Sequence, residues 1–116
     1  MKTRSPITTH VLDVSKGKPA DRITVSLETQ TSGSWMELSK KKTNGDGRVE
    51  DFLPVDHKLS AGTYRLQFET EKYFQSKHGE GFYPSVTITF SIKQSDQHYH
   101  VPLLLSPFGY STYRGS

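Results

Sequence analysis

The stretch from Val86 to Ile92 constrains the fold most, because apolar and polar side chains alternate along it without interruption. The apolar side chains are Val86, Ile88, Phe90 and Ile92, and the polar side chains between them are Thr87, Thr89 and Ser91. Consecutive side chains of a β-strand point to opposite faces, so this period of two places all of the apolar groups on one face. The stretch therefore predicts a half-buried β-strand.

Two shorter alternations predict further strands at residues 23–28 and 64–68. The composition agrees with an all-β protein, because only two alanines are present, against twelve threonines and twelve phenylalanine or tyrosine residues. Segments rich in turn-forming residues divide the chain at short intervals, near residues 16–19, 31–34, 44–47, 60–62 and 106–109. We expect seven or eight short strands between these turns.

One short helix is expected at Glu69–Lys77, where Tyr73 and Phe74 can dock against the rest of the protein. Gly79 and Gly81 follow this segment and are expected to end the helix. The economical architecture is a β-sandwich with one small helix. Because the composition shows no break and no internal repeat, we expect a single domain over residues 1–116.

Size, charge and cysteine content exclude several classes of protein. A chain of 116 residues buries about two thirds of its surface on folding, which allows one modest core. No apolar run approaches the length of a membrane span, and no leader typical of a signal peptide follows Met1, so we expect neither. The net charge of +3, with Lys40–Lys42 as the basic run, is too small for a nucleic-acid-binding surface. Since cysteine is absent, thiol chemistry is excluded and a cytoplasmic location is expected.

The histidines differ in their surroundings. His57 and His78 lie in polar or glycine-flanked loops, where we expect exposed side chains without a role. His10 shares one face of a predicted strand with Thr8 and Leu12, so its imidazole faces a packed layer or a cleft.

His98 and His100 are two residues apart, which in a strand places both imidazoles on one face, about 6.6 to 6.8 Å apart along the strand. This spacing leaves three interpretations open. The pair could join His10 in binding a zinc ion that also holds water. Alternatively, one neutral imidazole could act as a general base on water beside a cation. The third interpretation is a pair of half-exposed strand histidines with no chemical role.

Arg48 and the C-terminal residues are further candidates. Arg48 follows the turn at residues 44–47, where it is either solvated or able to donate several hydrogen bonds to a flat, anionic or carbonyl-rich ligand. Chain ends usually fray, but the last residues here are rich in β-favouring types. They can pair as a final strand that presents Tyr113, Arg114 and Ser116, or form an adhesive edge strand.

Four separated segments together carry a resemblance that covers nearly the whole chain. They are Thr8-Thr9-His10-Val11-Leu12-Asp13 with Gly17-Lys18-Pro19-Ala20, Thr43-Asn44-Gly45-Asp46-Gly47-Arg48, His98-Tyr99-His100-Val101-Pro102-Leu103-Leu104-Leu105-Ser106-Pro107, and Tyr113-Arg114-Gly115-Ser116. In this order they resemble the motifs of the 5-hydroxyisourate hydrolases, the transthyretin-related proteins of purine catabolism. Several motifs in one order are far more specific than any single motif.

The resemblance implies a transthyretin-like sandwich of two four-stranded sheets with one short helix. It also implies a homotetramer, a dimer of dimers, with active sites in the channel between the dimers. The catalytic positions that it implies are His10, Arg48 and His100. The substrate-binding positions that it implies are Tyr113, Arg114, Gly115 and Ser116, with His98 in a supporting role.

The implied reaction is the opening of the cyclic amide of 5-hydroxyisourate to give 2-oxo-4-hydroxy-4-carboxy-5-ureidoimidazoline. We expect attack by a histidine-activated water with Arg48 stabilising the substrate, no cofactor, no metal, and neither nucleic acid nor membrane as a partner. The alternative is a non-catalytic carrier of a small ligand, as transthyretin is for thyroid hormone. That carrier lacks both channel histidines, the arginine and the terminal Tyr-Arg-Gly-Ser. Family members also occur in peroxisomes, which a longer precursor would allow.

Overall fold

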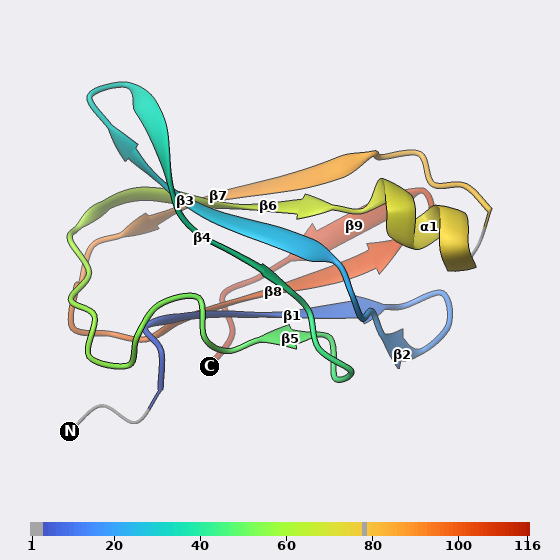
Figure 1. The fold of residues 1–116 in the computed structure, drawn as a ribbon, viewed down its shortest axis with the longest axis horizontal. Helices are drawn as coiled ribbons and strands as arrows, with labels where there is room; N and C mark the ends of the chain where they lie inside the picture. The colour runs from blue at the N-terminus through green and yellow to red at the C-terminus, as the bar shows by residue number, and fades with distance from the viewer. Residues whose placement is uncertain (1–3, 78) are drawn as a thin grey trace.

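Two β-sheets stack on each other in the computed structural model, which describes residues 4–77 and 79–116 (Figure 1). In chain order the elements are β1 (Ile7–Asp13), β2 (Lys18–Pro19), β3 (Thr24–Thr31), β4 (Ser34–Lys42), β5 (Arg48–Val49), β6 (Gly62–Glu69), α1 (Glu71–Lys77), β7 (Ser85–Ile92), β8 (Tyr99–Ser106) and β9 (Gly109–Thr112). One sheet has the order β4-β3-β6-β7, and the other has the order β2-β1-β8-β9 with β5 also paired to β1. Among the residues described, no helix has the length and apolar character needed to cross a membrane.

The expected sandwich of two four-stranded sheets is confirmed, and two very short strands share the fourth position of one sheet. Along one edge of β1, β8 pairs in parallel over the whole strand. On the other edge, β2 pairs with Leu12 and Asp13, and β5 pairs with Thr9 and His10. The described part of the chain therefore contains nine strands rather than seven or eight.

The three strands predicted from alternation are all present, as β3, β6 and β7. Their apolar faces point into the space between the sheets, where Leu27, Leu66 and Val86 are buried. Val11 and Leu103 from the opposite sheet belong to the same core cluster. The alternation therefore identified the side of each strand that forms the core.

Helix α1 begins at Glu71, two residues after the expected start at Glu69. Glu69 instead ends β6, where it pairs with strands on both sides, so sheet pairing prevails over helix formation there. Tyr73 and Phe74 are buried as expected. The backbone N–H of Gly79 donates to the carbonyl of Phe74 at 2.8 Å, and its φ of +93° is a conformation that suits glycine after a helix.

The register of β1 against its neighbours determines which side chains meet on the outer face of its sheet. Thr8 is paired with His100 of β8, and His10 is paired with Arg48 of β5. Alternate residues of β1 point into the core, so Thr8 and His10 lie on the opposite face. Three strands from distant parts of the sequence thus bring these side chains together.

Candidate active site

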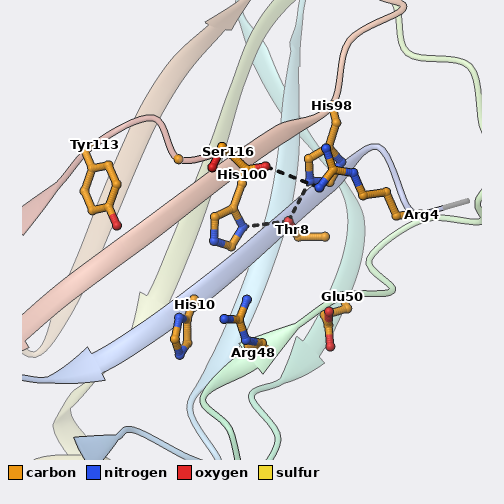
Figure 2. Close-up of a pocket in the computed structure, with 10 residues that line it drawn as sticks. Arg4, Thr8, His10, Arg48, Glu50, His98, His100, Tyr113 and Ser116 are labelled. Atoms are coloured by element: carbon orange, nitrogen blue, oxygen red, sulfur yellow. Dashed lines mark hydrogen bonds between the residues drawn. The ribbon is translucent and has the colours of Figure 1, made fainter. Parts of the chain in front are cut away.

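A pocket of about 380 Å³ lies on the outer face of the sheet that contains β1, β5 and β8 (Figure 2). It is lined by Arg4, Thr8, His10, Arg48, Glu50, His98, His100, Tyr113, Gly115 and Ser116. Apart from Arg114, every residue that the sequence nominated for the site is in this lining. The structure therefore brings together residues that come from both ends and from the middle of the chain.

A tight turn holds Arg48 at the start of β5. The side-chain oxygen of Asn44 accepts hydrogen bonds from the backbone N–H groups of Asp46, at 2.9 Å, and of Arg48, at 3.0 Å. Gly47 has a φ of +75°, and a Cβ there would overlap the carbonyl oxygen of Val11, so this position requires glycine. Within residues 4–77 and 79–116, no carboxylate forms an ion pair with the Arg48 guanidinium. Its donors can therefore serve a ligand.

His10 of β1, His100 of β8 and His98, which immediately precedes β8, face the same pocket (Figure 2). The hydroxyl oxygen of Thr8 lies 2.7 Å from Nδ1 of His100 and 3.1 Å from Nε2 of His98. Thr8 is buried, whereas the three imidazoles are half-buried. Of the two surroundings expected for His10, a packed layer or a cleft, the structure shows the cleft.

The surroundings lower the pKa of the pocket histidines. Burial is the largest cause of the lowered pKa of His100, followed by the charge of Arg48 and then by His98, His10 and Arg4. Burial and then Arg48 likewise lower the pKa of His10. An imidazole with a pKa below its ordinary value of about 6.5 is neutral at pH 7, and a neutral ring carries the lone pair that a base needs.

The C-terminal tail continues beyond β9 and runs beside His100. The backbone N–H of Gly115 donates to the carbonyl of His100 at 2.8 Å, which forms an isolated bridge. A Cβ on Gly115 would lie 2.7 Å from Cδ2 of His100, so the absence of a side chain lets the tail approach the imidazole. Tyr113 and Ser116 line the pocket with it. A final strand thus forms as β9, but it ends at Thr112, and the residues beyond it form a wall of the site.

Arg114 points away from the pocket. Its guanidinium lies 4.4 Å from the centre of the Tyr99 ring, and it donates to the side-chain oxygen of Gln97 at 2.9 Å and to the carbonyl of His98 at 3.3 Å. Consecutive side chains of an extended segment alternate in direction, which separates Arg114 from Tyr113. In this structure Arg114 fastens the tail to the start of β8.

Three lining residues were not nominated from the sequence. Thr8 is two residues before His10 on the same strand face, and Glu50 is two residues after Arg48, so alternation could have found both. Arg4 gave no such signal. It reaches the pocket because its Nη1 donates to the backbone oxygen of Ser116 at 3.3 Å, a contact between the two ends of the chain.

His57 and His78 are the histidines that were expected to be exposed and without a role. His57, expected to be exposed, is half-buried in its loop and is not in the pocket lining. His78 lies outside the described residues. In the part of the chain that the structure describes, no group of three or more His, Cys, Asp or Glu side chains is arranged to hold a metal ion.

Residues 7–115 match the sequence profile of the HIUase/Transthyretin family. The chain belongs to this family. It is 47% identical over 110 residues to a probable 5-hydroxyisourate hydrolase from Caenorhabditis elegans, and the match covers 95% of this chain and 81% of the relative. Membership confirms the resemblance that the four sequence motifs carried.

Two solved structures show whether the fold alone can separate the hydrolases from the transthyretins within the HIUase/Transthyretin family. The 5-hydroxyisourate hydrolase of Klebsiella pneumoniae has a TM-score of 0.83 at 38% identity, covering 97% of this chain and 99% of the other. A sea bream transthyretin in complex with thyroxine has a TM-score of 0.88 at 27% identity, covering 96% and 95%. The backbone is therefore as similar to a hormone-binding member as to a hydrolase, and the side chains of the site must separate the two functions.

Proposed function

We infer that the chain is a 5-hydroxyisourate hydrolase, an enzyme of urate degradation, and we propose that the pocket of His10, Arg48 and His100 is its active site. The activity rests on the level of identity to hydrolases of this family. The observation that carries the site is the convergence of two imidazoles with lowered pKa and a guanidinium without an ion-pair partner among the described residues. On one surface, the imidazoles supply a base and the guanidinium supplies a positive charge that can stabilise an oxyanion.

The proposed reaction begins with a water molecule held between the imidazoles and the substrate. His10 and His100 jointly orient this water, and one imidazole takes a proton from it as the water oxygen bonds to the carbonyl carbon of the cyclic amide. The carbon–nitrogen bond of the amide then breaks, and the departing nitrogen receives the proton from the imidazolium. The products are a carboxylic acid, which ionises by releasing its proton to solvent, and a ureido group, so atoms and protons balance.

Arg48 has the complementary role in this proposal. Its guanidinium binds and polarises the carbonyl oxygens of the substrate and stabilises the negative charge of the tetrahedral intermediate. General-base catalysis contributes about 10² to 10⁴ in rate, and one oxyanion donor contributes about 10² to 10³. Because the substrate ring is already electrophilic, these two contributions are sufficient without a metal or a cofactor.

The tail and His98 form the proposed substrate-binding wall. Tyr113, Gly115, Ser116 and His98 all line the pocket, and His98 lies beside Thr8. Arg114, which we include among the binding residues on the resemblance, acts in this proposal by holding the tail against Tyr99. The wall then gives the planar substrate one defined orientation.

We also propose that the enzyme assembles as a dimer of dimers in the cytoplasm. Phe82 and Phe108 expose 68% and 69% of their surface, and the backbone N–H of Phe82 donates to the Pro107 carbonyl at 2.7 Å, so the two loops lie together. Tyr110, also exposed, contacts Tyr83 in the same region. Exposed aromatic patches of this kind are typical of protein interfaces. Light scattering coupled to size exclusion measures the assembly directly.

The decisive experiment follows the ultraviolet decay of freshly generated 5-hydroxyisourate with and without the protein, in the presence of a metal chelator. We expect faster decay with the protein, a loss of at least about 10² in kcat for His100→Ala, and a similar loss for Arg48→Ala. His57→Ala, outside the pocket, is the matched control and should retain full activity. Activity of His100→Ala within threefold of the parent would remove His100 from the mechanism. A folded protein that does not accelerate decay would favour a ligand carrier instead.

A further inference from the structure

The hydroxyl of Thr8 joins the two histidines of the His-Tyr-His segment (Figure 2). We propose that Thr8 is a positioning residue that holds His100 in the tautomer protonated at Nδ1, by accepting that N–H while donating its own proton to Nε2 of His98. The choice of tautomer rests on the proposed function, because it follows from the role of His100 as the base in that reaction. The tautomer itself can be measured without the reaction.

The number of protons on the three side chains limits the hydrogen bonds that they can form. A threonine hydroxyl has one proton and two lone pairs, and a neutral imidazole has one N–H and one lone pair. Burial lowers the pKa of both His98 and His100, so both rings are neutral at pH 7. If Thr8 donates to one ring, it must accept from the other for both contacts to be hydrogen bonds. Two directions are possible, and they place the proton of His100 on different nitrogens.

The pocket selects one direction. Nδ1 of His100 contacts Thr8, so Nε2 is the ring nitrogen of His100 that is left for a water molecule in the pocket. A base needs a lone pair on that nitrogen, which places the His100 proton on Nδ1 and makes the Thr8 oxygen its acceptor. The Thr8 proton is then donated to Nε2 of His98. The proton of His98 is on Nδ1, a buried atom without a hydrogen-bond partner among the described residues.

The position of the His100 proton follows from this direction. With its own proton donated to His98, the Thr8 oxygen accepts the Nδ1–H of His100 at 2.7 Å, and the lone pair of His100 is on Nε2. His100 lines the pocket, so this lone pair is available to a water molecule there. When the water proton moves to Nε2, the resulting imidazolium still donates from Nδ1 to Thr8, and this hydrogen bond becomes stronger because its donor is charged.

The register of the sheet makes this arrangement rigid. Thr8 and His100 are directly paired residues of β1 and β8, in the parallel ladder that spans both strands. The next residue, Thr9, points into the core, where its hydroxyl donates to the carbonyl of Val101 at 2.6 Å. Thr9 therefore offers a matched control, since it is the same residue type on the same strand but faces away from the pocket.

The first test reads the tautomers directly. In the wild-type protein with ¹⁵N-labelled histidine, long-range ¹H–¹⁵N spectra at pH 8 distinguish the protonated nitrogen of each neutral ring, and His98→Gln and His100→Gln assign the signals. We expect both rings to carry the proton on Nδ1. Any other combination of tautomers overturns the proposal. This test needs no Thr8 variant to fold and no catalytic activity.

The second test is kinetic. Thr8→Val keeps the shape of the side chain but removes the hydroxyl, and we expect kcat to fall by about tenfold or more, with KM changed less than threefold. Thr8→Ser restores the hydroxyl and should stay within threefold of the parent in kcat. Thr9→Val should lower thermal stability without lowering kcat. In Thr8→Val, the His100 proton should move from Nδ1 to Nε2.

The outcomes separate this proposal from the proposed function. Two outcomes would show that the hydroxyl does not position His100. One is an equal loss of kcat in Thr8→Val and Thr8→Ser, and the other is a kcat of Thr8→Val within twofold of the parent. If the wild-type protein leaves the decay of 5-hydroxyisourate unchanged, the proposed function fails, but the tautomers of the two rings still decide the role of Thr8.

Discussion

Replacing Gly115 with alanine tests whether the tail determines the position of His100. The added Cβ would lie 2.7 Å from Cδ2 and 3.4 Å from Cγ of His100, and 3.2 Å from Cγ of Pro102. Favourable contacts between carbon atoms occur at about 3.5 to 4.0 Å, so the imidazole and the tail must separate by roughly 1 Å. A displacement of this size in a catalytic group can cost about 10² in rate. We expect Gly115→Ala to lower kcat by about 10- to 100-fold.

The fold itself should tolerate this change, because the pairing near Gly115 is an isolated bridge at the end of the sheet. We expect the free energy of unfolding to change by less than about 0.5 kcal/mol. Gly109→Ala is the matched control, since its Cβ would meet Ser106 Oγ at 3.8 Å, an ordinary contact. The assay combines initial rates of 5-hydroxyisourate decay with thermal unfolding of each variant. If Gly115→Ala keeps kcat within threefold of the Gly109→Ala control, the tail does not position the imidazole.

Three further predictions concern pH dependence and stability. The pKa values of His10 and His100 are lowered, so their base forms persist below about pH 6.5 and are lost only as the pH falls through the lowered pKa. We therefore expect kcat/KM to be independent of pH from pH 6.5 upward. An inflection above pH 7 would contradict this. In Arg48→Met, NMR titration should show higher pKa values for His10 and His100 than in the parent, because the substitution removes a cation that disfavours the imidazolium form. Tyr73→Phe removes a hydrogen bond of 2.7 Å to the buried Asp13 carboxylate. We expect the free energy of unfolding in urea to fall by about 1.5 to 3 kcal/mol, with kcat unchanged. A variant as stable as the parent would refute the importance of this bond.

Much of the fold could be predicted because strand formation leaves a local pattern. The alternation along residues 86–92 identified both the strand and its buried face, since the period of two depends only on backbone geometry. Helix α1 was placed correctly except for its start, because Glu69 is held in the sheet by strands that are distant in sequence. The very short strands β2 and β5 have too few residues to form a pattern. They exist because β1 offers them an unpaired edge.

The sequence predicted some residues of the candidate site correctly and missed the orientation of others. His10, Arg48 and His100 were nominated from separate motifs, and the structure brings them to one pocket. Arg114 was nominated with its neighbours, but the alternation of the extended tail turns its guanidinium toward Tyr99. No motif could have revealed this direction, because it depends on how the tail pairs with β8.

The sequence by itself determined the all-β class, the faces of the longer strands and the family, because these depend on local alternation and on residue types at fixed spacings. Only the tertiary structure decided which side chains touch. The contact of Thr8 with both histidines joins positions about ninety residues apart, and it exists because β1 pairs in parallel with β8 in one particular register. A shift of one residue would turn Thr8 toward the core and disrupt the pocket. The alternation along each strand indicates which face is buried, but it does not indicate which residue of β8 lies opposite Thr8.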